Sequence, residues 1–229
     1  MGARIAEAWA DGEARTGPAL DPAYAPRVVK PLARVDAAAD EVDARLRKAL
    51  DQIVDAAQSA NARVVLAVPA TNLSHVPKHP LAGPGRTSED AARVDQVIAQ
   101  ARRASGTIAL ELWTEALRLD PHRADALHGW GMARLRMGGA PASAVAALRA
   151  AVDHDYSSHR PTRAVREALM DHCAPPRVSC IDLDSELSRK ARGAIVPADW
   201  FADHCHPSEV GTQQIGTVIA AVVLEGVDD

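Results

Sequence analysis

Hydrophobic positions in the first half of the chain change from a helical to a strand period. From residue 35 to 58 the apolar side chains recur at steps of three and four, which predicts one amphipathic helix. The run from Val64 to Val68 is short, continuous and rich in β-branched residues, and Pro69 ends it. Such a run is typical of a strand buried on both faces. A helix followed by a buried strand indicates an α/β fold.

Helices dominate the predicted structure after this strand. Residues 86–155 carry a helical pattern throughout, and shorter helices are expected at 162–171, 185–192 and 210–224. A second short strand, parallel to the first, is expected near 178–183. Because two parallel strands do not make a stable sheet by themselves, we expect something else to complete the sheet.

Composition and charge narrow the class of protein. Apolar residues form 47% of the chain and aromatic residues only 3%, which favours closely packed helices. The net charge is −4 and the arginines are scattered singly, so we expect no nucleic-acid partner. No apolar run reaches the length of a membrane span, and the first residues do not form a signal peptide. We therefore expect no membrane partner.

The cysteines suggest a cellular compartment. Cys173, Cys180 and Cys205 are an odd number at irregular spacing, which does not describe a disulfide framework. We therefore expect a cytoplasmic protein. Residues 1–34 are rich in glycine and proline, and after a short helix at 3–10 they are expected to form an irregular connector.

Small and bulky residues alternate within 86–155 in a way that resembles tetratricopeptide repeats. The small, bulky, small and proline positions of one repeat match Ala109, Trp113, Ala116 and Pro121, and 124–155 repeats the pattern. The resemblance covers about one and a half repeats, too few to bury a core alone, so we expect these helices to pack against the α/β part. We expect Trp113 and Trp130 to fill gaps between helices rather than to bind a ligand.

The loop after the first strand contains the first candidate site residues. In an open α/β sheet, ligands bind beyond the carboxyl ends of the strands. The polar residues at this position are Thr71, Asn72, Ser74, His75 and His79.

A second candidate site lies near the C-terminus. Asp203, two intervening residues, His206-Pro207, and Gly211 precede a final apolar helix. In order and spacing this segment resembles the last sequence block of the SGNH (GDSL-type) hydrolase superfamily. The resemblance implies that His206 is a general base and that Asp203 orients its imidazole, as in other serine hydrolases.

The resemblance extends over roughly residues 35–224 and corresponds to the C-terminal half of that family's fold. It implies a partial three-layer, flavodoxin-like α/β domain made of residues 35–85 and 156–229. Residues 86–155 would be an inserted helical segment, as in a bacterial subfamily with helical repeats. The same likeness, which includes His159-Arg160-Pro161, makes Asn72, His75 and Arg160 candidate substrate-binding residues. The substrate would be an ester, or an acyl group on a carbohydrate or small metabolite.

One part of the family pattern is missing. Residues 1–63 contain no strand followed by Gly-x-Ser, so the serine nucleophile and the oxyanion donors are absent. Without them an Asp–His pair performs little acyl transfer. We therefore expect an esterase-like or acyl hydrolase-like chain, without a cofactor, that is inactive or incomplete alone. A partner protein would bind the helical repeats or complete the sheet.

Three other interpretations remain open at this stage. The chain could be a non-catalytic interaction module built on tetratricopeptide helices. Asp203 could simply cap a helix beside a surface histidine. A metal site is the third, because imidazole and thiolate groups suit zinc. Its ligands would come from His172, Cys173, Cys180, His204, Cys205 and His206.

Overall fold

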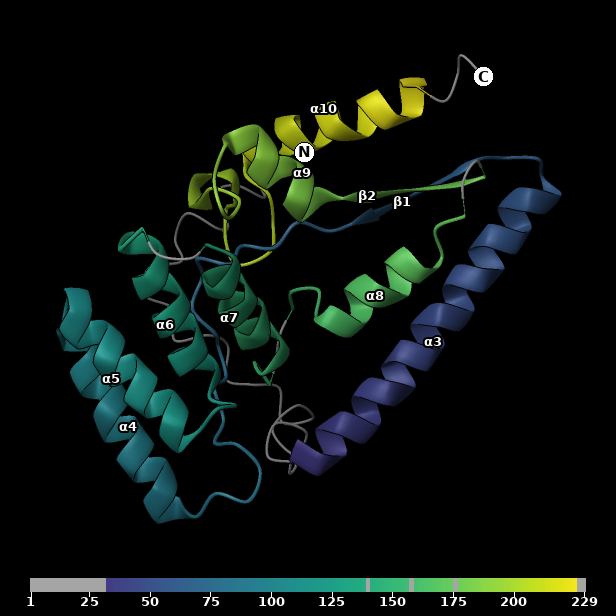
Figure 1. The fold of residues 1–229 in the computed structure, drawn as a ribbon. Helices are drawn as coiled ribbons and strands as arrows, with labels where there is room; N and C mark the ends of the chain where they lie inside the picture. The colour runs from purple at the N-terminus through teal and green to yellow at the C-terminus, as the bar shows by residue number, and fades with distance from the viewer. Residues whose placement is uncertain (1–31, 139–140, 157–158, 175–176, 226–229) are drawn as a thin grey trace, which may run out of the picture.

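The computed structural model describes residues 32–138, 141–156, 159–174 and 177–225 of the chain (Figure 1). Most of the predicted connector, including its short helix at 3–10, lies outside the described residues. None of the described helices is both long and apolar enough to cross a membrane. In chain order the elements are α3 (Leu32–Ser59), β1 (Val64–Val68), α4 (Ser88–Arg103), α5 (Gly106–Leu119), α6 (Ala124–Arg136), α7 (Pro141–Asp153), α8 (Arg163–Asp171), β2 (Val178–Asp182), α9 (Leu183–Ala191), a 3-10 turn (Ala198–Trp200) and α10 (Glu209–Glu225).

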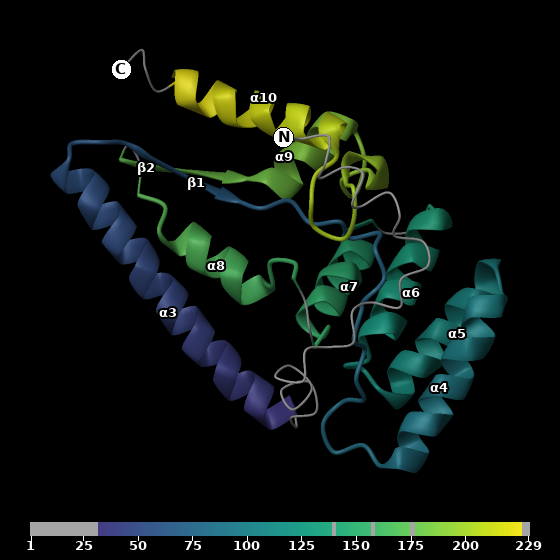
Figure 2. The same cartoon turned by 180° about the vertical axis from the view of Figure 1, so that it is seen from behind.

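The two strands form a parallel pair between helices. Val64 pairs with Val178, and Val68 pairs with Asp182. Successive side chains of a strand point to opposite faces, so the sheet buries apolar groups on both sides. Leu66 and Val178 pack in one cluster with side chains of α3 and α8. Ile181 belongs to a second cluster with side chains of α9 and α10. Figures 1 and 2 show the resulting order of helices, sheet and helices.

The two predicted strands, their parallel pairing and the helix-rich character are confirmed, and the structure is compatible with the α/β class. Leu183 begins α9 instead of extending β2. Within the described ranges, β1 and β2 are the two strands of the sheet, and Val178 also forms a single bridge with Ala174. The structure therefore does not show what completes the sheet, and this expectation stays a prediction.

Helices α4 to α7 stack beside the end of the sheet (Figure 1). Their close approach depends on small residues, as the sequence predicts. A Cβ on Gly129 would collide with the ring of Trp113, and a Cβ on Gly131 would lie 2.8 Å from Leu148. Trp113 is buried in the core of this stack, where it fills space between helices. Whether the stack belongs to the tetratricopeptide class stays a prediction.

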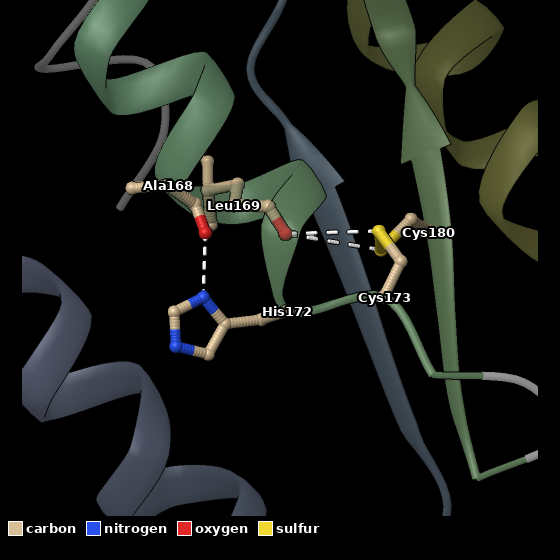
Figure 3. Close-up of a disulfide and its surroundings, with 5 residues drawn as sticks. All are labelled: Ala168, Leu169, His172, Cys173 and Cys180. Atoms are coloured by element: carbon tan, nitrogen blue, oxygen red, sulfur yellow. Dashed lines mark hydrogen bonds between the residues drawn. A yellow bond between two sulfur atoms is a disulfide. The ribbon is translucent and has the colours of Figure 1, made fainter.

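A disulfide that the sequence did not predict joins α8 to β2. Cys173 follows α8 and bonds to Cys180 in the middle of β2, with their Cα atoms 5.8 Å apart. Figure 3 shows both sulfur atoms near the carbonyl oxygen of Leu169, at 3.7 and 3.9 Å. Since disulfides persist mainly in oxidising compartments, the cysteine pattern no longer supports the expectation of a cytoplasmic protein.

Breaking this disulfide should weaken the contact between α8 and the sheet. The crosslink spans only seven positions of the chain, so the loop-closure entropy that it removes from the unfolded state is modest. We expect the double variant Cys173→Ala/Cys180→Ala to lose about 2 kcal/mol of unfolding free energy, measured by urea denaturation. Cys205→Ala is the matched control and should change little. Thiol titration of the unfolded wild type should find one thiol without reductant, and finding three would contradict the assignment.

Candidate functional site

Three segments meet beyond the carboxyl ends of the strands. β1 runs into Thr71 and Asn72, β2 runs into α9, and the loop between the 3-10 turn and α10 returns to the same edge. The side-chain amide of Asn72 donates a hydrogen bond of 2.8 Å to the backbone oxygen of Asp203. The backbone N–H of Thr71 donates to Asp184 Oδ1 at 2.7 Å. The parallel pairing therefore brings the start of α9 into contact with Thr71 and the loop of Asp203 into contact with Asn72.

The carboxylate of Asp203 organises its own loop. Its Oδ1 accepts hydrogen bonds from the backbone N–H groups of Cys205, at 2.8 Å, and His206, at 2.7 Å. Its Oδ2 lies 2.8 Å from His206 Nδ1. Partial burial raises the pKa of Asp203, but the hydrogen bonds from His206 and Cys205 outweigh it and hold that pKa well below the usual carboxyl range.

These contacts determine which nitrogen of His206 is basic. An ionised carboxylate only accepts hydrogen bonds, so the proton of the neutral imidazole is assigned to Nδ1. The lone pair is then on Nε2. The His206 side chain is 62% exposed, so a reacting group can approach the ring. The structure brings Asp203 and His206 into contact, and their predicted catalytic roles stay predictions.

Backbone contacts close the loop from 201 to 207 and connect it to α10. Ala202 N–H donates to the His206 carbonyl at 2.8 Å, and Ser208 N–H donates to the Trp200 carbonyl at 2.9 Å. A Cβ on Gly211 would collide with the Trp200 carbonyl oxygen, so only glycine fits at this position without displacing α10. The spacing from Asp203 to Gly211 thus reflects a packing requirement of the loop.

A buried ion pair holds the other loop, residues 71–79, in place. Arg160 donates to Asp155 Oδ2 at 3.2 Å and to the carbonyl of His75 at 2.9 Å. Asp155 also accepts hydrogen bonds from the backbone N–H groups of Lys78 and His79. The side chains of Arg160 and Asp155 are only 3% and 2% exposed. Arg160 therefore helps to position this loop, and its predicted substrate-binding role stays a prediction.

Three histidines gather next to the Asp203 loop. The ring of His204 lies 5.6 Å from the rings of both His75 and His159, measured between centroids. Lys78 Nζ approaches His204 Nε2 to 3.4 Å. Burial, and then the charge of Lys78, lowers the pKa of His204. The structure thus brings the predicted residue His75 close to the loop of Asp203.

Only some of the metal ligands proposed from the sequence lie close enough together to bind one ion. The ligand atoms of Asp203, His204 and Cys205 lie within 4.8 Å of one another. The ammonium group of Lys78 opposes a cation beside His204. Cys173 and Cys180 offer no thiolate because they are bonded to each other. The structure therefore contradicts the larger ligand set.

The described serines near the loop have other roles. Ser74 Oγ donates to Asn72 Oδ1 at 2.6 Å, and Ser208 Oγ donates to the Asp199 carbonyl at 2.8 Å. Asn72 uses its amide to hold Asp203. The predicted substrate-binding role of Asn72 is untested, and its observed contacts are structural.

Comparison with protein-family models, curated proteins and solved structures yields no match for this chain. The resemblance of the C-terminal segment to the SGNH superfamily therefore stays a prediction from the sequence.

Two residues that hold the site, Asp155 and His128, were missed in the sequence. Both contact the loop of residues 71–79, more than fifty positions away in the chain, so no local pattern signals these contacts. His128 is buried, and its Nε2 lies 3.0 Å from the Ser74 carbonyl. Burial lowers the pKa of His128 to about 4, which favours the neutral ring as a donor to that carbonyl.

This histidine makes stability depend on pH. The pKa of His128 in the folded state, about 4, lies below its ordinary value of 6.5, so its contribution to the unfolding free energy is complete above pH 6.5 and is lost as the pH falls toward 4. When the pH falls from 7 to 4.5, we expect the wild type to lose roughly 2 kcal/mol more unfolding free energy than His128→Gln. Urea denaturation at the two pH values measures this difference. The exposed control His122→Gln should follow the wild type, and an unchanged pH dependence in His128→Gln would refute the assignment.

Proposed function

We propose that this chain supplies the Asp–His pair of an SGNH-type ester or acyl hydrolase. The observation that carries the proposal is the 2.8 Å contact between Asp203 Oδ2 and His206 Nδ1, made by a carboxylate that also binds two backbone N–H groups of its own loop. This arrangement orients the imidazole and leaves Nε2 as its basic nitrogen. A helix cap beside a surface histidine would not require the second carboxylate oxygen to meet the ring.

The chemistry follows from these contacts. His206 Nε2 accepts the proton of a serine hydroxyl as that oxygen attacks an ester carbonyl, and then returns the proton to the leaving alkoxide. Asp203 stays ionised and stabilises the imidazolium that forms between the two steps. The serine and the oxyanion donors are supplied by another chain. The substrate is an ester, or an acyl group on a carbohydrate or small metabolite.

A second candidate function is binding of a peptide by the helical stack. A cavity of about 710 Å³ lies between the loop around Ser74 and helices α4, α5 and α6. Trp113 contributes to its wall, together with the charged residues Arg102, Asp125 and Arg136. Tight peptide binding without any turnover would favour this function over the hydrolase.

The proposal is tested with an activated ester. We expect the chain alone to hydrolyse 4-nitrophenyl acetate no faster than free imidazole, because it lacks a positioned nucleophile. Mixed with the serine-bearing protein, sought among products of the flanking genes, it should become active. His206→Gln should then lower the rate by at least about a hundredfold, the scale of general base catalysis.

The exposed variant His122→Gln is the matched control and should leave the rate of the mixture unchanged. Labelling with a fluorophosphonate probe identifies the chain that carries the nucleophile. Activity that survives His206→Gln would exclude His206 as the base.

A further inference from the structure

A separate cavity of about 420 Å³ lies beside the same edge of the sheet. The loop after β1 contributes Thr71 to its wall, α7 contributes Arg149, and the start of α9 contributes Asp184. The first turn of α8 adds Arg163 and Arg166. Neither Asp203 nor His206 lines this cavity. Its size is within the range of small-molecule sites.

Positive charge exceeds negative charge in this wall. Three arginines, Arg149, Arg163 and Arg166, face two acids, Asp153 and Asp184, a formal excess of one positive charge. Both terminal nitrogens of Arg166 already bind carboxylates: the side chain donates to Asp184 at 2.8 Å and to Asp182 at 2.8 and 2.9 Å.

The other two arginines keep donors for a ligand. The ion pair of Arg149 with Asp184 is 3.8 Å long, and that of Arg163 with Glu167 is 4.0 Å long. Both lengths exceed hydrogen-bond distance. The side chains of Arg149 and Arg163 are 34% and 79% exposed, which places Arg149 deeper than Arg163.

Thr71 gives an independent reason to expect a ligand. The residue is only 3% exposed, and its Oγ1 has no hydrogen-bond partner in the described structure. Its backbone N–H is already satisfied by Asp184. A buried hydroxyl without a partner is unfavourable, and such groups are rare in native proteins. A bound oxygen atom in the cavity would satisfy it.

We propose that this cavity binds the oxyanion group of a small molecule, the phosphate, sulfate or carboxylate end of a metabolite. The hydroxyl of Thr71 donates to one ligand oxygen, and the guanidinium groups of Arg149 and Arg163 donate to the others. Planar guanidinium groups match the geometry of such oxyanions. The apolar residues of the wall accommodate the rest of the molecule; they are Leu73, Ala146, Ala150, Val152 and Pro161.

Isothermal titration calorimetry with the full chain tests this site. Inorganic phosphate, sulfate and acetate are titrated separately at constant ionic strength, so the three arms distinguish a phosphate, a sulfate and a carboxylate ligand. We expect saturable binding of at least one anion at a single site. Thr71→Val and Arg149→Gln should each weaken that binding at least tenfold. Arg118→Gln, on the exposed surface of α5, is the matched control and should bind like the wild type.

Thermal unfolding separates loss of the site from loss of the fold. Thr71→Val removes an unpaired hydroxyl and keeps the side-chain shape, so without anion it should unfold at the same temperature as the wild type or higher. The variant His206→Gln should bind the anion normally, which separates this site from the proposed hydrolase function. Absence of saturable binding for all three anions, or equal binding by wild type, Thr71→Val and Arg149→Gln, would overturn the proposal.

Discussion

The parallel pairing of β1 and β2 is the constraint on which both sites depend. Because Val68 lies beside Asp182, the residues that follow each strand emerge at one edge of the sheet. Thr71 then binds Asp184 through its backbone, while Asn72 binds the backbone of Asp203 through its side chain. Two adjacent residues thus hold two segments that lie more than a hundred positions further along the chain. A shift in the register of the two strands would break both contacts at once.

Buried charge at this edge is compensated by networks rather than by isolated pairs. Arg160 forms an ion pair with Asp155 and also donates a hydrogen bond to the carbonyl of His75. Asp155 accepts hydrogen bonds from two backbone N–H groups of the same loop. Arg166 binds two carboxylates, Asp182 and Asp184. Removing one member of such a network leaves a buried charge uncompensated, so these residues specify one arrangement of the loops. Specific hydrogen bonds therefore hold these loops, although they contain no helix or strand.

Local patterns in the sequence predicted the elements well, and long-range contacts poorly. Val64–Val68 is an apolar run bounded by proline, and both ends of β1 were predicted from it. The Asp203–His206 pair is also local, since three positions separate its members. Cys173 and Cys180 were not predicted to bond, because their approach depends on how α8 packs on the sheet. Arg160 was a candidate binding residue through the family resemblance, and no sequence pattern signalled its buried ion pair with Asp155.

In the proposed function Asp203 orients His206 as a base, and the tautomer of the His206 ring tests this role most directly. Two-dimensional ¹H–¹⁵N NMR of the imidazole nitrogens, at a pH where the ring is neutral, distinguishes protonated Nδ1 from protonated Nε2. We expect a proton on Nδ1 in the wild type. In Asp203→Ala we expect the ring to change to the more common tautomer, with the proton on Nε2. A wild-type ring protonated on Nε2 would contradict the proposed role of His206, because its basic nitrogen would then face the carboxylate of Asp203.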